Sequence, residues 1–206
     1  MIKKGMTILY MVGKNLYVNL TNRCPYSCTF CLRQSRDSMA DNNDTLWLER
    51  EPEVWEIKAE FEKFDMDSIN ELVFCGYGEP TERLEVLLEI AAFVKEKYNK
   101  PIRINTNGAA NLIWGRDVTG ELEGLIDTLS ISLNTPSAEK YHELVRSRFG
   151  DVSYEAMLDF ARRAKQYVPK VVMTTVETTI SHEEEEQCRK ICEEMGVTYR
   201  IRPWED

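Results

Sequence analysis

Short apolar runs alternate with longer amphipathic stretches along most of this chain. Apolar runs of strand length lie at 72–75, 102–106, 129–133 and 171–176, and a weaker one follows at 197–201. Short apolar runs of this length are typical of the buried strands of a sheet. The pattern therefore predicts five buried strands.

Helical periodicity fills segments between these runs. Apolar residues spaced three and four positions apart form the buried stripe of a helix. Three such stripes are present: Leu84, Leu87, Leu88, Ala91 and Val94; Tyr154, Met157, Leu158, Ala161 and Ala164; and Cys188, Ile191, Cys192 and Met195. Strands that alternate with helices imply right-handed crossovers and a parallel sheet.

Two further apolar runs, 7–11 and 16–20, come first and are joined by Gly13-Lys14-Asn15, which predicts a β-hairpin. With the second hairpin arm, the chain has six β/α units, too few for an eight-stranded barrel. We therefore predict an α/β fold, a partial (β/α)6 barrel with a short N-terminal β-hairpin. An open doubly wound sheet is the alternative. Because no repeat or proline-rich linker interrupts the chain, residues 1–206 are expected to form a single domain.

The composition narrows the classes of partner. A chain of 206 residues with a net charge of −9 has room for one sizeable core and argues against general binding of nucleic-acid phosphates. No apolar run is long enough for a membrane span, and the first residues lack a secretion signal, so we expect a cytoplasmic protein that does not bind membranes. The polar segment 34–44 predicts a long surface loop.

Three of the six cysteines, Cys24, Cys28 and Cys31, lie within eight residues directly after the second hairpin arm. In a reducing compartment, clustered thiols are typical of ligands rather than disulfides. Thiolates hold iron–sulfur clusters, and three of them on a four-iron cube leave one iron open to a small molecule. The alternatives are a zinc loop and three unconnected buried thiols. Zinc would need a fourth ligand, whereas His142 and His182 lie far away in the sequence.

The spacing Cys-x3-Cys-x2-Cys, with Phe30 just before the last cysteine, resembles the signature of the radical S-adenosylmethionine (radical SAM) superfamily. The resemblance implies a 4Fe-4S cluster on the three cysteines whose open iron binds S-adenosyl-L-methionine (SAM). An electron then cleaves SAM to a 5'-deoxyadenosyl radical, which abstracts hydrogen from a substrate. It also implies an electron donor such as a flavodoxin or a ferredoxin.

The turn Gly76-Tyr77-Gly78-Glu79 follows the strand that ends at Cys75. By itself it is an ordinary strand-to-helix turn, with Glu79 near the start of the next helix. One β/α unit beyond the cysteines, it resembles the Gly-Gly-Glu motif that binds the SAM amino group in this superfamily. Tyr77 departs from that motif, because it replaces the second glycine.

Short polar side chains end the next two strands. They are suited to ribose hydroxyls and a carboxylate, and they resemble SAM contacts of the superfamily. The alternatives are a turn at Asn107-Gly108 and a helix cap at Asn134. The predicted contacts are Asn105, Thr106 and Asn107 after one strand, and Ser132 and Asn134 after the other.

Other candidate residues are less specific. Arg146 and Arg148 are expected to be solvated at the surface. Arg200 and Arg202 share one face of the last strand, and the pattern leaves open whether they point into a cavity or outward. Cys75 is expected to pack as a small hydrophobic residue, as are the two cysteines of the third stripe. No residue is assigned as a general acid, general base or nucleophile.

Five segments, 15–24, 46–49, 74–80, 103–108 and 130–134, resemble a compact radical SAM group described as TatD family-associated. That resemblance implies association with a TatD-type metal-dependent hydrolase and leaves the substrate unknown. Three functions stay open. The first is a radical SAM enzyme, the second a glycyl-radical activating enzyme that acts on a partner protein, and the third a non-catalytic electron-transfer protein. The third is disfavoured because it would want a fourth cysteine.

Overall fold

A computed structural model describes residues 5–35 and 45–203. Most of the loop predicted at 34–44 lies outside these residues. The chain divides into two compact units, each described here by itself. The first unit comprises the described parts of Met1–Cys24, Leu32–Asn105 and Leu125–Asp127, and the second those of Pro25–Cys31, Thr106–Gly124 and Thr128–Asp206.

The strands of the first unit follow chain order. β1 (Leu9–Val12) pairs with β2 (Asn15–Val18) in antiparallel fashion, and β2, β3 (Glu71–Phe74) and β4 (Ile102–Thr106) are parallel. The predicted hairpin is confirmed, and Gly13 takes the positive φ of 59° that its tight turn needs. Because parallel strands start at the same edge, the carboxyl ends of β2 and β3 lie next to each other.

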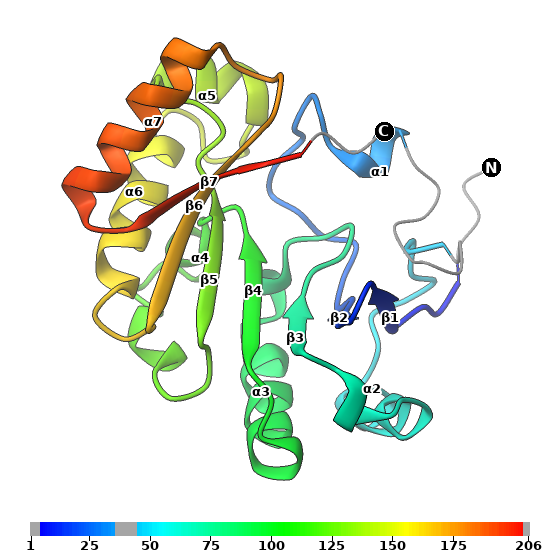
Figure 1. The fold of residues 1–206 in the computed structure, drawn as a ribbon. Coiled ribbons are helices and arrows are strands. Elements are labelled where there is room, and N and C mark those ends of the chain that lie inside the picture. Colours follow the sequence, from blue (N-terminus) through cyan, green and yellow to red (C-terminus); the bar gives the residue numbers. More distant parts are fainter. Residues whose placement is uncertain (1–4, 36–44, 204–206) are drawn as a thin grey trace. The chain divides into compact units, whose positions relative to one another are not determined.

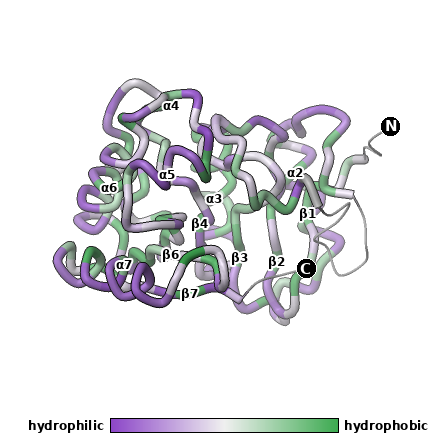
Figure 2. The backbone as a smooth tube through the Cα atoms, turned by 90° about the horizontal axis from the view of Figure 1, so that it is seen from above, coloured by the Kyte–Doolittle hydropathy of each residue, from purple (hydrophilic) through white to green (hydrophobic). Residues whose placement is uncertain are grey.

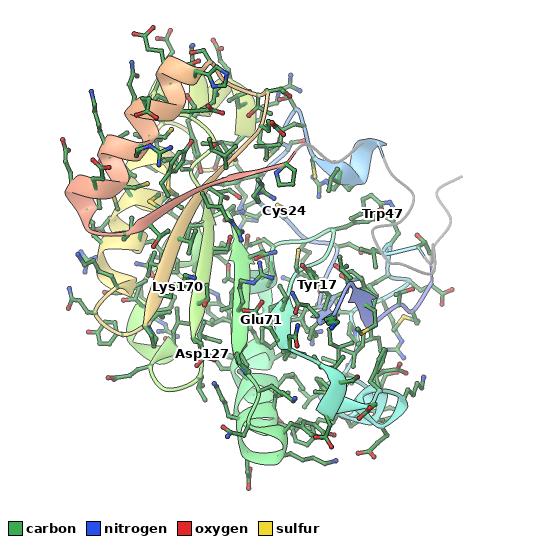
Figure 3. The ribbon with its side chains drawn as sticks, in the orientation of Figure 1. Tyr17, Cys24, Trp47, Glu71, Asp127 and Lys170 are labelled. Carbon is green, nitrogen blue, oxygen red and sulfur yellow. The ribbon has the colours of Figure 1, made fainter. Side chains whose placement is uncertain are left out.

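Helices of the first unit are α1 (Leu32–Ser35), α2 (Val54–Glu60) and α3 (Leu84–Tyr98), with short 3-10 helices η1 (Phe61–Lys63), η2 (Met66–Ser68) and η3 (Pro80–Arg83). The predicted stripe of α3 is largely right, but Ile90 is fully buried whereas Leu88 is half-buried. At the amino end of β4, Arg103 pairs at 2.9 Å with Glu71 of β3, which is labelled in Figure 3.

In the second unit, β5 (Thr128–Ser132), β6 (Lys170–Val176) and β7 (Thr198–Arg202) form a parallel array. Its helices are α4 (Ala110–Trp114), the 3-10 helix η4 (Thr119–Leu122), α5 (Ala138–Val145), α6 (Val152–Ala164) and α7 (His182–Met195). Figure 1 shows α5, α6 and α7 gathered on one side of these strands. The buried side chains of Ile131 and Met173 belong to this helix-covered face.

The helices of the second unit carry the amphipathic pattern that the sequence predicts. The five stripe residues of α6 are buried, as are Cys188, Cys192 and Met195 of α7. Figure 2 shows that hydrophilic and hydrophobic positions alternate along α6 and α7.

Every predicted strand is present, with ends within two residues of the prediction. In the described ranges, no helix combines the length and apolar content that crossing a bilayer requires.

Candidate functional site

The loop that carries the predicted ligands is fastened to the end of α5. Residues 25–31 have no helix or strand, yet the N–H of Ser27 donates to the carbonyl of Val145 at 2.9 Å, and that of Thr29 donates to Leu144 at 2.9 Å. Carbonyls in the last turn of a helix have no partner within the helix. The loop backbone therefore caps α5, and α5 in turn fixes the path of the loop.

Tyr26 anchors the same loop in the core of the second unit. Its side chain is 3% exposed and meets the ring of Tyr141 edge-on, with ring centroids 6.3 Å apart. Tyr141 in turn packs against Tyr154 at 5.3 Å, and burial raises the pKa of Tyr154 to about 12. An aromatic column thus lies directly under the stretch between the first two cysteines of the motif, where it restricts the loop.

The three predicted ligands are all half-buried. All six cysteines of the chain lie in the described residues, and each stands as a thiol rather than in a disulfide. Cys24 belongs to the first unit (Figure 3), whereas Cys28 and Cys31 belong to the second, where the N–H of Cys31 donates to the carbonyl of Cys28 at 3.2 Å. Among the described side chains, no three of Cys, His, Asp or Glu are gathered to hold a metal ion.

The predicted SAM turn lies against the backbone that leads into the cysteine loop. A Cβ atom on Gly76 would lie 2.2 Å from Asn19 Oδ1, and one on Gly78 would lie 2.2 Å from the carbonyl oxygen of Thr21. Only glycine fits such close approaches. The N–H of Glu79 also donates to the carbonyl of Arg23 at 2.8 Å. The structure thus joins the turn to the residue just before Cys24.

Tyr77 replaces a glycine of the related motif because its side chain has a buried place of its own. It is 4% exposed and packs in a hydrophobic cluster with Tyr10 and Leu46. Trp47 lies against it, with ring centroids 5.2 Å apart. The side chain is therefore part of the core, which leaves its backbone to form the turn.

Glu79 stands at the start of the next helix, as the sequence suggested for its position. Its side chain is 4% exposed, and Oε1 accepts hydrogen bonds from the N–H of Thr81 at 3.1 Å and from the Thr81 hydroxyl at 2.7 Å. These contacts cap η3, which begins at Pro80. The cap fixes the carboxylate next to the glycine turn, and its binding of SAM stays a prediction.

Glu51 is a residue of this region that the sequence reasoning missed. Its carboxylate accepts hydrogen bonds from the Thr21 hydroxyl at 2.6 Å and from Arg23 Nε at 2.6 Å, and it lies 3.5 Å from Arg83 Nε. Arg83 also donates to the carbonyl of Leu20 at 3.2 Å. One carboxylate therefore connects residues 21–23, which the glycine turn contacts, with Arg83 at the end of η3. The sequence gives no signal for it, because the partners lie about 30 residues away in either direction.

The environment of Glu51 favours its charged form. Burial raises the pKa of the carboxyl group, but the hydrogen bonds from Thr21 and Arg23 outweigh burial and leave the pKa below its ordinary value. A carboxylate with a lowered pKa stabilises the fold above its unfolded-state pKa, and that contribution is lost as the pH falls through the folded-state pKa.

Predicted SAM contacts at the end of β4 are engaged in local hydrogen bonds. Asn105 Oδ1 accepts from Arg103 at 3.2 Å, Thr106 Oγ1 accepts from the N–H of Gly108 at 3.1 Å, and Asn107 Oδ1 accepts from the N–H of Ala109 at 2.9 Å. The turn expected at Asn107-Gly108 is thus present. Ligand binding by these side chains stays a prediction.

Asn134, at the end of β5, differs from them. Its φ is +65°, in the left-handed region that non-glycine residues rarely adopt. Its side chain is 4% exposed, and Oδ1 has no hydrogen-bond partner among the residues that the structure describes. An unsatisfied buried acceptor costs about 1–3 kcal/mol. Strain and an unpaired acceptor at one residue are typical of a ligand site.

The remaining candidate residues differ in how far they are exposed. Arg146 and Arg148 are exposed, as predicted, and Arg148 lies over the ring of Phe149 at 4.8 Å. The cysteines of α7 are fully buried, and burial raises the pKa of each thiol to about 12. Phe30, Cys75 and Ser132 are half-buried.

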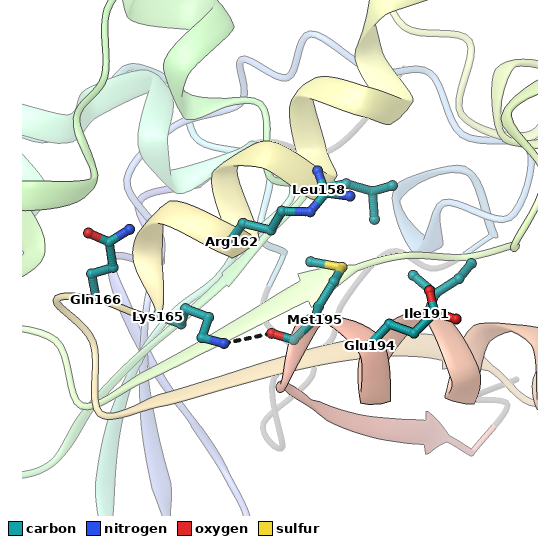
Figure 4. A pocket seen from close by; sticks show the side chains of 7 residues that line it. All are labelled: Leu158, Arg162, Lys165, Gln166, Ile191, Glu194 and Met195. Carbon is teal, nitrogen blue, oxygen red and sulfur yellow. Dashed lines mark hydrogen bonds between the residues drawn. The ribbon is translucent and has the colours of Figure 1, made fainter.

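A hollow between α6 and α7 in the second unit is shown in Figure 4. Lys165 Nζ donates there to the carbonyl of Met195 at 2.7 Å, which caps the end of α7. The hollow is lined by Leu158, Arg162, Lys165, Gln166, Ile191, Glu194 and Met195, a set that contains none of the predicted site residues. The candidate site therefore lies elsewhere.

Comparisons with known proteins agree with the motif assignment. A family model described as "Radical SAM superfamily" matches residues 18–195. A curated relative, "Probable GTP 3',8-cyclase" of Methanocaldococcus jannaschii, is 29% identical over 140 residues, which cover 68% of this chain and 42% of the relative. The chain thus spans less than half the length of that relative.

Solved structures share the fold at low identity. Streptococcus suis SuiB bound to precursor peptide SuiA matches with a TM-score of 0.62 and 17% identity, over 92% of this chain and 39% of SuiB. The structure "Native anSMEcpe with bound AdoMet" matches with a TM-score of 0.63 and 19% identity. The match covers 92% of this chain and 51% of the anSMEcpe chain. These matches confirm the predicted α/β fold class, the partial barrel of radical SAM structures.

The role of Glu51 leads to a prediction on local stability. In Glu51→Gln, the weaker contacts to Thr21 and Arg23 should lower the free energy of unfolding by about 1 kcal/mol near neutral pH. Amide hydrogen exchange at Glu79, measured by NMR, should become faster because its acceptor Arg23 is less restrained. The difference from wild type should shrink as the pH falls through the lowered pKa of Glu51.

The matched control is Arg50→Gln, which breaks the neighbouring Arg50–Glu56 pair at 2.6 Å without touching residues 21–23. It should leave exchange at Glu79 unchanged. Equal acceleration in both variants would show that Glu51 has no special hold on the turn.

Proposed function

Because the chain belongs to the radical SAM superfamily, we propose that it is an iron–sulfur enzyme that cleaves SAM reductively and abstracts hydrogen from a substrate. The observation that carries the proposal is the contact between the glycine turn and the segment before Cys24. Glu79 donates to the Arg23 carbonyl at 2.8 Å, so a motif resembling the SAM turn adjoins the first cysteine of the cluster motif.

The donor set fits a 4Fe-4S cluster. Cys24, Cys28 and Cys31 are half-buried thiols in a segment without regular structure, and hydrogen bonds fix its backbone at Arg23, Ser27 and Thr29. We assign these three thiolates as the ligands. When bound, such a cluster with one open iron supplies the electron that converts SAM into methionine and a 5'-deoxyadenosyl radical.

SAM would be held by the ends of the strands. The backbone of Gly76, Tyr77 and Gly78 offers close approach, and the carboxylate of Glu79 would accept hydrogen bonds from the SAM amino group. Asn134 Oδ1, buried and without a protein partner, suits a hydroxyl or N–H donor of SAM. Phe30, Asn105, Thr106, Asn107 and Ser132 complete the proposed set.

Further parts of the proposal rest on the family. The match from residue 18 to 195 runs through both units, which supports a single radical SAM domain over residues 1–206. A flavodoxin or a ferredoxin would supply the electron. The likeness to TatD family-associated proteins suggests a TatD-type hydrolase as a partner.

Turnover of SAM tests the proposal directly. Protein reconstituted with iron and sulfide should produce 5'-deoxyadenosine from SAM under a strong reductant, measured by chromatography. In Cys28→Ala, iron binding and 5'-deoxyadenosine should both be lost while the fold persists, because the N–H groups of Ser27 and Thr29 still cap α5.

Cys188→Ala is the control for this experiment. It removes a thiol that is buried in α7, and it should retain iron. If wild type takes up iron yet produces no 5'-deoxyadenosine, the enzymatic proposal fails. If Cys28→Ala keeps full iron content, the ligand assignment fails.

Glu79→Gln isolates the charge of this side chain. Its amide oxygen still accepts from Thr81, so η3 keeps its cap, whereas the ionic contact to the SAM amino group is lost. SAM affinity should fall about tenfold, the effect of one charge-assisted hydrogen bond, with an unchanged cluster spectrum. The control Glu85→Gln alters an exposed carboxylate of α3 and should bind SAM normally. Unchanged affinity in Glu79→Gln would remove Glu79 from the site.

Asn134→Gly separates backbone conformation from ligand binding. Glycine accepts the left-handed conformation, so the free energy of unfolding should change by about 1 kcal/mol or less, whereas SAM affinity should fall about fivefold with the lost acceptor. Asn99→Gly makes the same exchange at another left-handed residue, φ +48°, at the end of α3. Titration calorimetry should show normal SAM binding there. If both variants bind SAM equally well, Asn134 serves the backbone alone.

A further inference from the structure

Asn19 connects three segments of the first unit. It directly follows β2, it is fully buried, and its backbone N–H donates to the carbonyl of Ile8 at 2.8 Å. In the side chain, Nδ2 donates to the carbonyl of Leu46 at 2.9 Å and to that of Thr7 at 3.2 Å. These contacts use both amide hydrogens. They also fix the orientation of the carboxamide, because an oxygen in the place of Nδ2 would face two other oxygens.

The other end of the carboxamide, Oδ1, faces the first glycine of the turn. A Cβ on Gly76 would lie 2.2 Å from Oδ1 and 2.8 Å from Cγ of Asn19. The Cα–H bond that this Cβ would replace therefore points toward Oδ1, the arrangement of a weak Cα–H···O hydrogen bond. Oδ1 is buried and has no conventional hydrogen-bond partner in the described part of the chain. Buried polar atoms are seldom left in this state, so the contact with Gly76 requires an explanation.

Gly76 has no backbone hydrogen bond of its own to hold it. On one side, the N–H of Cys75 donates to the carbonyl of Val18 at 3.1 Å, and further on the N–H of Glu79 donates to the carbonyl of Arg23 at 2.8 Å. Gly76 lies between these contacts, is half-buried, and makes no hydrogen bond to any other residue in the described ranges. A ligand can therefore bind its N–H and carbonyl groups without replacing a bond within the protein.

Space, and not the backbone conformation, makes glycine necessary at position 76. Gly76 is not among the glycines with a positive φ, so the φ at this position is open to alanine. Atoms of Asn19 fill the space that a Cβ would need, and once Oδ1 and Cγ are removed the nearest atom is Asn19 Cα at 3.3 Å. Gly78 differs, because its Cβ would meet the carbonyl oxygens of Thr21 at 2.2 Å and Arg23 at 2.6 Å.

We propose that Asn19 is a positioning residue for SAM, whose carboxamide fixes Gly76 by side-chain contact and so leaves the backbone polar groups of Gly76 to the ligand. This inference rests on the proposed function, because the glycine turn is assigned there to SAM. A turn that is already fixed in the unliganded protein loses less conformational entropy on binding. Asn19 therefore raises SAM affinity through Gly76, without touching SAM itself.

The test is a double-mutant cycle in the reconstituted protein, read by SAM titration and by melting temperature. Gly76→Ala should bind SAM about tenfold more weakly and melt about 5 °C lower, because its Cβ overlaps a carboxamide that two hydrogen bonds hold in place. Asn19→Ala should bind SAM about fivefold more weakly. The double variant should match Asn19→Ala within about twofold in affinity and melt no lower, since the new Cβ enters the emptied space.

Kinetics separate positioning from general damage to the fold. In Asn19→Ala, the KM for SAM should rise about fivefold, whereas kcat for 5'-deoxyadenosine at saturating SAM should stay within about twofold of wild type. Iron content and the cluster spectrum should not change. Asn19→Ser also lacks Oδ1 and Cγ, but its hydroxyl can donate to one of the two carbonyls. It takes the place of Asn19→Ala in the cycle if that variant does not fold.

Two controls show whether the rescue is specific to the contact. Asn22→Ala removes another asparagine that makes two hydrogen bonds, to the backbone of Leu48 at 2.7 and 3.0 Å, but it creates no space at position 76. Combined with Gly76→Ala, it should give no rescue. Gly78→Ala should likewise not be rescued by Asn19→Ala, because its Cβ meets backbone atoms.

Two results would overturn the inference. Additive losses in the cycle, or a double variant that does not fold, mean that Asn19 is not what requires glycine at position 76. A wild-type KM for SAM in Asn19→Ala means that Asn19 serves the fold alone. The melting temperatures are measured without SAM, so they test the contact between Asn19 and Gly76 independently of turnover. Wild type that forms no 5'-deoxyadenosine contradicts the proposed function instead.

Discussion

The close approach of the glycine turn to residues 19–23 is the constraint on which the first unit depends. Two parallel strands, β2 and β3, end side by side, and the chain beyond each must pass the other without room for a side chain. Glycine at 76 and 78 permits that passage. The backbone hydrogen bond from Glu79 to Arg23 then fixes the two segments in register. This contact therefore sets the position of the glycine turn relative to Cys24.

A third segment, residues 48–51, holds that contact from outside. Asn22 exchanges two hydrogen bonds with the backbone of Leu48, at 2.7 and 3.0 Å, much as a neighbouring strand would. Glu51 continues the same segment and binds Thr21 and Arg23. The second unit uses a different device, because its part of the cysteine loop satisfies the last carbonyls of α5. In each unit, an irregular segment is fixed by groups that would otherwise lack hydrogen-bond partners.

Periodicity was enough to predict the strands and the main helices, because burial of one stripe or one run decides these elements. The cysteine motif was equally visible, since its ligands are close in the sequence. The place of Tyr77 was not predictable, because the aromatic side chain that receives it, Trp47, is distant in the chain and is brought there only by folding. Glu51 was missed for the same reason. The left-handed φ of Asn134 left no mark in its neighbours, because asparagine at a strand end also fits a helix cap.

The predicted SAM contacts differ in the hydrogen bonds that they already make, and therefore in the binding energy that a ligand would gain from each. Thr106 and Asn107 already accept from backbone N–H groups, so a ligand that takes over these oxygens must replace existing bonds. Asn134 Oδ1 has no bond to replace, and a donor that reaches it removes the cost of a buried unsatisfied acceptor. Binding energy should therefore concentrate at Asn134 rather than at the end of β4. The N–H of Asn134 also donates to the carbonyl of Thr174, so this acceptor is held at the end of β5 by a backbone contact to β6.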